Sequence, residues 1–144
     1  MTYRITGLAP ETFAPFFLMD DAELAKHRAR RVVADSDRGF PCRVSLEDGR
    51  AGEELLLIHH THHQVETPYR SAFAIFVRRQ ARAATWLDQP PPVFAGRTLS
   101  LRGFGEGGDL AQARLAAPDE ADEAIRTLLE DRTIAYIDAH NAAA

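Results

Sequence analysis

The chain lacks the features that mark several classes of protein. It has one cysteine among 144 residues, Cys42, which excludes a scaffold of internal disulfides and indicates a reducing compartment. Its apolar runs are far shorter than the roughly 20 residues that cross a membrane. Residues 1–4 do not begin a signal peptide, because no basic segment leads into an apolar core. We therefore expect a cytoplasmic protein that has no membrane partner.

Basic residues are also scarce. The 17 lysines and arginines are outnumbered by 21 acidic residues, which gives a formal net charge of −4. Nucleic-acid binders usually carry a basic excess, because phosphate contacts supply much of their affinity. We therefore expect no nucleic-acid partner. The glycines at 103–109 fit no nucleotide-binding fingerprint, and we predict a hairpin loop there.

The composition and the periodicity of the chain are those of a globular domain. Hydrophobic residues make up 45% and charged residues 26%, and 144 residues is an ordinary length for one domain. We predict a single α+β domain over residues 1–144, a mostly antiparallel twisted sheet of about five to seven strands with two main helices packed on it. The helices are expected to begin at the caps Asp20 and Asp119. The expected strands lie within residues 2–8, 31–34, 42–46, 55–63, 72–77, 98–102, 110–115 and 132–141, with 55–58 and 72–77 central.

A histidine cluster is the first candidate site. Residues 59–63 contain four of the six histidines. On a strand, His60 and His62 would share one face about 6.5–7 Å apart, from which two imidazoles can bind one metal ion. Asp138 and His140 share a face of the last predicted strand and are candidates for the third ligand, a set that suits a divalent transition metal. The alternative is a solvated strand end that happens to be rich in histidine.

Arginine and cysteine supply the other candidates. Arg43 lies on the polar side of an alternating segment, and Arg70 follows Tyr69 at a predicted bend. Together with His62 and His140, these three would form a pocket for a small anion, because guanidinium groups bind carboxylate or phosphate through two donors. The alternative is that both arginines pair with nearby acids.

Cys42 is a candidate nucleophile if an imidazole such as that of His62 or His140 lies beside it. It also alternates with Val44 and Leu46, a pattern that favours a small buried hydrophobic residue.

Several blocks of the chain resemble a bacterial domain-of-unknown-function family (DUF, number 1203). The blocks are residues 39–48, residues 68–70 with 74–78, and residues 136–137 with 140–142. The resemblance implies a cytosolic bacterial single-domain protein and no particular activity. Within the histidine cluster, only His62 matches a histidine of the family.

The chain departs from the family pattern in two places. Family members tend to read Tyr-Ile-His-x-His-Asn near the end, and here Asp138 replaces the first histidine. They also commonly continue past the Asn-Ala pair with an Arg-Gly-Cys-Tyr-like segment, whereas this chain ends at Ala144. If these positions form the family's site, we expect this copy to be altered or inactive.

Three functional hypotheses follow from these candidates. The first is a domain that binds a small anionic molecule in an Arg/Tyr/His pocket. The second is a metal- or cysteine-dependent enzyme that uses the histidine cluster. The third is a non-catalytic interaction protein, for example a homodimer joined through an edge strand. All three depend on where the middle of the chain lies relative to its carboxyl end.

Overall fold

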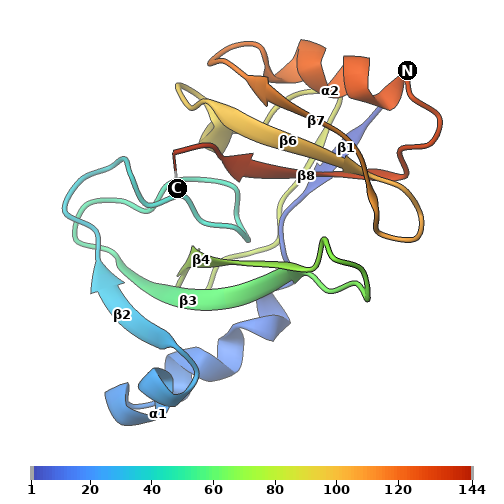
Figure 1. The fold of residues 1–144 in the computed structure, drawn as a ribbon. Coiled ribbons are helices and arrows are strands. Elements are labelled where there is room, and N and C mark those ends of the chain that lie inside the picture. The colour runs from blue at the N-terminus through green and yellow to red at the C-terminus, as the bar shows by residue number, and fades with distance from the viewer. Residues whose placement is uncertain (1, 144) are drawn as a thin grey trace.

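The computed structural model describes residues 2–143 and shows an α+β domain built on antiparallel strands (Figure 1). Three sheets are present, with strand orders β1-β5, β2-β3-β4 and β7-β6-β8. The strands are β1 (Arg4–Thr6), β2 (Ala29–Val33), β3 (Glu54–His63), β4 (Ser71–Arg78), β5 (Thr85–Leu87), β6 (Leu99–Phe104), β7 (Leu110–Ala116) and β8 (Tyr136–Asn141). The helices are α1 (Asp21–Lys26) and α2 (Ala121–Leu129), with short 3-10 turns at Pro10–Thr12, Ala14–Leu18 and Pro92–Phe94.

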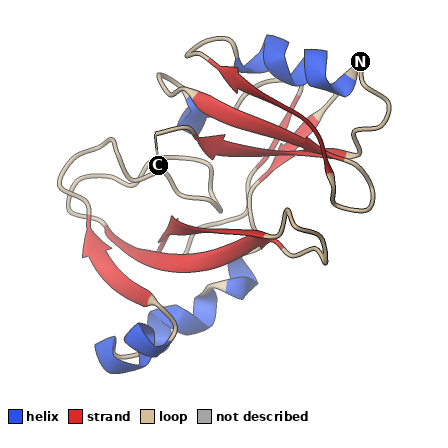
Figure 2. Cartoon of the chain, viewed as in Figure 1, coloured by secondary structure: helices blue, strands red, loops and turns tan. Residues whose placement is uncertain are grey.

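The two three-stranded sheets lie in separate layers, and the two helices lie on the outer sides of these layers (Figure 2). The predicted α+β fold with antiparallel strands and two helices is confirmed. The strands divide among three sheets because β2–β4 and β6–β8 each pair only within their own group.

The first layer consists of the sheet β2-β3-β4, covered by the first helices of the chain. α1 begins where predicted, because the Asp20 side chain accepts a hydrogen bond of 2.8 Å from the backbone N–H of Glu23 and the Glu23 side chain bonds back to Asp20. Its buried residue Leu24 packs into an apolar core. The other buried members of this core are Phe13, Ala29, Cys42, Val44, Leu56, Ile58, Ile75 and Val77.

The second layer consists of β7-β6-β8 and α2. Gly105 and Gly108 close the hairpin between β6 and β7, as predicted for this glycine-rich loop. α2 buries its apolar face on the sheet, but its cap residue is Glu120 and not Asp119, which adopts a positive φ of 71° in the preceding turn. Among residues 2–143, none of the helices combines the length and the apolar character that spanning a bilayer requires.

The predicted strand at residues 42–46 is wrong. Cys42, Val44 and Leu46 are buried as the alternation predicted, but Leu46 has a φ of 56° and the segment forms turns with isolated bridges. The segment is held by tertiary contacts: the Arg43 N–H donates to the Phe76 carbonyl at 3.0 Å, and the Arg43 carbonyl accepts from Leu8 at 2.8 Å. Alternating burial therefore reflected docking of a loop and not pairing of a strand.

β4 was expected to be a central strand, but β3 is the central strand of its sheet. The free edge of β4 is partly covered by the Cys42 segment, which forms a parallel bridge from Cys42 to Phe76. The consequence for the site is that Arg43 is fixed beside β4.

Candidate metal centre

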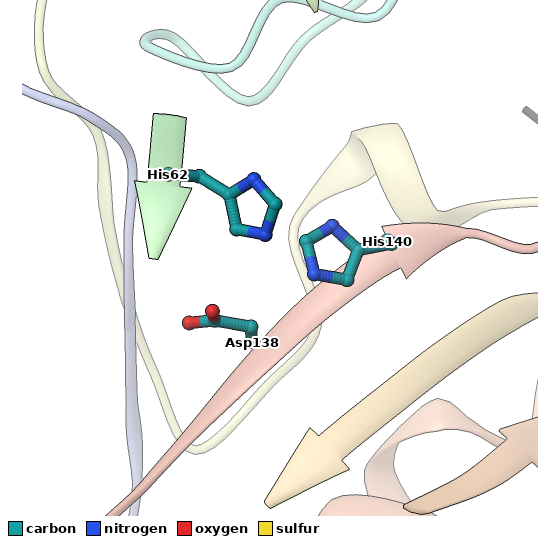
Figure 3. Close-up of side chains that lie close together, drawn as sticks. All are labelled: His62, Asp138 and His140. Atoms are coloured by element: carbon teal, nitrogen blue, oxygen red, sulfur yellow. The ribbon is translucent and has the colours of Figure 1, made fainter. Parts of the chain in front are cut away.

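The end of β3 and the end of β8 bring three side chains together, although they are far apart in the sequence (Figure 3). The ring centroids of His62 and His140 lie 4.5 Å apart. Asp138 lies two residues before His140 and on the same face of β8, as the strand period requires. One potential ligand atom from each of the three residues lies within 4.8 Å of the other two.

Irregular pairing at the end of β3 accompanies the position of His62. The β3–β4 register shifts between Thr61 and His63, so His62 has no direct partner on β4. Its ring instead stacks on Phe73 of β4, with a centroid distance of 5.0 Å and an angle of 6° between the rings. Phe73 also lies 4.9 Å from the ring of His140. The phenyl ring therefore supports both imidazoles.

Regular alternation positions the two ligands on β8. Ile137 and Ala139 pack against the core beneath α2, so the intervening Asp138 and His140 face the other way. β8 is held in this register by antiparallel pairing with β6, in which the backbone of Asp138 lies opposite Arg102 and that of His140 lies opposite Ser100. The site therefore stands on a strand that is anchored by the main apolar core of its layer.

Each of the three residues has a buried polar atom that lacks a hydrogen-bond partner. These atoms are Nδ1 of His62, Oδ2 of Asp138 and Nε2 of His140. Over residues 2–143, only one further buried side-chain atom, Oγ of Ser45, is in the same condition. Buried polar atoms are normally bonded in native proteins, so a cluster of unsatisfied ones requires an explanation such as a bound ion.

The electrostatics keep both imidazoles neutral. The pKa of His62 and that of His140 are lowered to about 4 each, mainly by burial and in addition by neighbouring basic groups, Arg43 and Arg102 among them. Burial raises the pKa of Asp138, an effect that His63 and Arg102 oppose. A neutral imidazole is the form that coordinates metal ions, so both histidines are ready to act as ligands at pH 7.

A cleft of about 580 Å³ adjoins the three residues and runs between the layers. Arg43 lines it, together with His62, Asp138 and His140. Burial lowers the pKa of the Arg43 guanidinium, and the positive charge of Arg97 adds to the effect. Arg43 donates one hydrogen bond, of 3.2 Å, to the carbonyl of Pro41. The cleft therefore joins a candidate metal centre to a partly buried cation.

Arg102 was not among the residues expected at the site. It lines a smaller hollow of about 350 Å³ on which His62 and His140 also border. Its guanidinium lies 6.0 Å from the ring of Phe104. Only the pairing of β6 with β8 brings it opposite Asp138, and nothing local to residues 98–102 indicates that pairing.

The other histidines of the cluster do not join the group. His59 is exposed, and His60 packs edge-on against Phe13 at 5.1 Å. His63 is buried with both ring nitrogens bonded: Nδ1 lies 3.0 Å from the Tyr69 carbonyl and Nε2 lies 2.6 Å from the Tyr136 hydroxyl.

Three further candidates lie away from the metal-binding group. Arg70 pairs with Glu66 at 3.2 Å and its side chain is half exposed, and neither it nor Tyr69 lines the cleft. Cys42 borders the cleft but is fully buried, and its Sγ accepts hydrogen bonds from the backbone of Ser45 and Arg78. Their roles in binding or catalysis stay predictions.

Comparison with known proteins bears on the family. The model of the family described as "Protein of unknown function (DUF1203)" matches residues 39–144. No curated protein and no solved structure matches the chain. The matched range includes His62, Asp138, His140 and Arg43, so the whole candidate centre lies inside it. Because the match covers well over half of the sequence, the chain belongs to the DUF1203 family.

Proposed function

We propose that the cleft binds a divalent transition-metal ion through His62, Asp138 and His140 and that the protein acts through this ion. The supporting observation is that these three side chains converge and that each has an unsatisfied buried polar atom. Two neutral imidazoles and one carboxylate form a donor set that suits iron, zinc, cobalt or manganese. The lone cysteine and the family resemblance support a bacterial cytoplasmic setting.

The number of protein ligands favours a reactive or ligand-binding metal over a structural one. Structural zinc sites are usually closed by four protein ligands, whereas catalytic sites use three and leave a position for water or substrate. The described residues offer three, and the cleft beside them has room for a small molecule. When bound, such an ion supplies Lewis-acid chemistry to a ligand in the cleft.

The experiment is a measurement of metal content and affinity on protein purified without a histidine tag. We expect native protein to bind one equivalent of Zn²⁺ or Co²⁺. His62→Ala, Asp138→Asn and His140→Ala should each weaken binding by about 100-fold or more, since each removes one of three ligands. Co²⁺ also gives a visible spectrum that reports its ligands.

The matched control is His59→Ala, an exposed histidine on the same strand. It should leave stoichiometry and affinity unchanged. Equal metal binding by His62→Ala and native protein, or loss of binding in His59→Ala alone, would contradict the proposed site.

A further inference from the structure

Arg43 has no ion-pair partner among the described residues, because Asp48, the carboxylate whose charge raises the pKa of Arg43, forms its ion pair with Arg97 instead. Among residues 2–143, no carboxylate lies within 4 Å of its guanidinium, and its recorded side-chain hydrogen bond goes to the Pro41 carbonyl. Arg97, whose charge lowers the pKa of Arg43, does have an acidic partner: its guanidinium contacts Asp48 at 2.8 Å and also donates to the Val93 carbonyl. A guanidinium has five N–H donors, so Arg43 retains donors for a ligand.

The surroundings of the candidate metal centre share this positive excess. Arg43 lines the cleft together with His62, Asp138 and His140, and Arg102 lines the smaller hollow together with His62 and His140, so two guanidinium groups lie beside a centre whose one carboxylate is that of Asp138. A divalent cation bound at the centre would add two further positive charges. Partly buried positive charge without a counter-ion is costly, and an anion in the cleft would remove that cost.

We infer that the cleft receives a small organic carboxylate, whose carboxylate group is bound by Arg43 next to the metal ion. The planar fork of a guanidinium matches the two oxygens of a carboxylate. Apolar side chains such as Leu8, Ile75 and Phe73 line the same cleft and would contact the carbon skeleton.

A phosphate ester is the less favoured ligand, because phosphate sites commonly use several backbone N–H groups of a glycine-rich loop or of a helix N-terminus. No glycine is among the described residues that line the cleft. The inference rests on the proposed metal centre only in placing the ligand beside the ion. The Arg43 contact can be tested separately.

The experiment is calorimetric titration of butyrate, succinate and inorganic phosphate into Zn²⁺-loaded and metal-free protein. We expect the loaded native protein to bind butyrate or succinate, and Arg43→Gln to bind it about 10- to 100-fold more weakly, the loss typical of a charge-assisted contact. Arg43→Lys, which keeps the charge but loses the fork, should fall between the two. Arg79→Gln, at a half-exposed arginine outside the cleft, is the matched control and should bind like native protein.

Zinc content and thermal unfolding of every variant separate the two proposals. Arg43→Gln should keep its zinc and its fold, and if it unfolds, the comparison rests on Arg43→Lys. No binding of either carboxylate by loaded native protein, unchanged affinity in Arg43→Gln, or tighter binding of phosphate than of carboxylate would overturn the inference. Native protein without zinc but with Arg43-dependent carboxylate binding would refute the metal centre and leave the carboxylate site standing.

Discussion

His62 and His63, at the end of β3, both contact side chains of β8, but their hydrogen bonding differs. His63 is 4% exposed, stacks on Phe104 at a centroid distance of 3.9 Å, and has partners for both ring nitrogens. His62 borders the cleft and retains an unsatisfied ring nitrogen. The difference is set by what β8 presents: Tyr136, a hydrogen-bond partner, faces His63, whereas His140 faces His62. We call His63, whose ring nitrogens are both bonded, the closed site, because its contacts stabilise the fold. We call His62 with Asp138 and His140 the open site, because their unsatisfied atoms are available to a ligand.

The largest expected effects come from replacing each of these two histidines by alanine, because one variant should lose zinc and the other should lose stability. His62→Ala should abolish tight zinc binding, as given above, and change the stability of the metal-free protein little. His63→Ala should keep zinc and lower the free energy of unfolding by about 2–4 kcal/mol, because it removes a buried ring and leaves the Tyr136 hydroxyl without its partner. Urea unfolding and zinc titration of both variants test this crossover. A His63→Ala protein that is stable but free of zinc would reverse our assignment.

The stability of the metal-free protein should depend on pH through protonation of His62 and His140. His62 and His140 have folded pKa values of about 4, below the ordinary value near 6.5, so the unfolded chain binds more protons than the folded one between these values. Stability is therefore fully present above pH 6.5 and falls as the pH drops toward 4.

The measurement is urea unfolding at several pH values for native protein and for His62→Phe, which cannot be protonated at this position. The native curve should fall more steeply between pH 6.5 and 4 than the variant curve. Parallel curves would show that the folded state does not disfavour protonation of His62.

A smaller effect is expected from Tyr136→Phe. The change removes the hydroxyl that lies 2.6 Å from Nε2 of His63 and keeps the ring that packs on Phe104. We expect a loss of about 1 kcal/mol of unfolding free energy, since one buried hydrogen bond is lost, and no change in zinc affinity. Thermal and urea unfolding give the stability. A marked loss of zinc would show that the closed and open sites are coupled.

Among the variants of the three ligands, the smallest change in metal occupancy is expected from Asp138→His. This variant introduces the histidine that the family resemblance implies at this position, and it replaces one good ligand by another on β8. We expect zinc affinity within about tenfold of native, since both three-histidine and mixed sites bind zinc. Competition between Zn²⁺ and Mn²⁺ should shift toward zinc, because a carboxylate is the better ligand for manganese. Loss of zinc in Asp138→His would show that the site requires the carboxylate.

Much of this architecture follows from local patterns. A short apolar run predicted β3, alternation predicted β6 and β8 and placed Asp138 and His140 on one face, and the capping residues predicted the start of α1. The expectation that the middle of the chain meets its carboxyl end is met by the contact of His62 with His140.

Other candidates depended on contacts that no local pattern reveals. His60 packs on Phe13, which is 47 residues earlier in the chain, and Arg70 forms an ion pair with Glu66 within its own loop, away from the cleft. Arg102 enters the site only through the pairing of β6 with β8. The predicted strand at residues 42–46 failed for the same reason, since burial with period two does not distinguish a paired strand from a docked loop.

The sequence by itself determined the elements and the faces of the strands, because side-chain alternation, caps and turn residues act over a few neighbours. Only the tertiary structure decided which faces meet. Each layer buries its own apolar core, assembled from segments that are distant in the chain, and the arrangement of the two layers places His62, Asp138, His140 and Arg43 around one cleft. The contrast between a closed His63 and an open His62 exists only after that packing, because their partners come from β8.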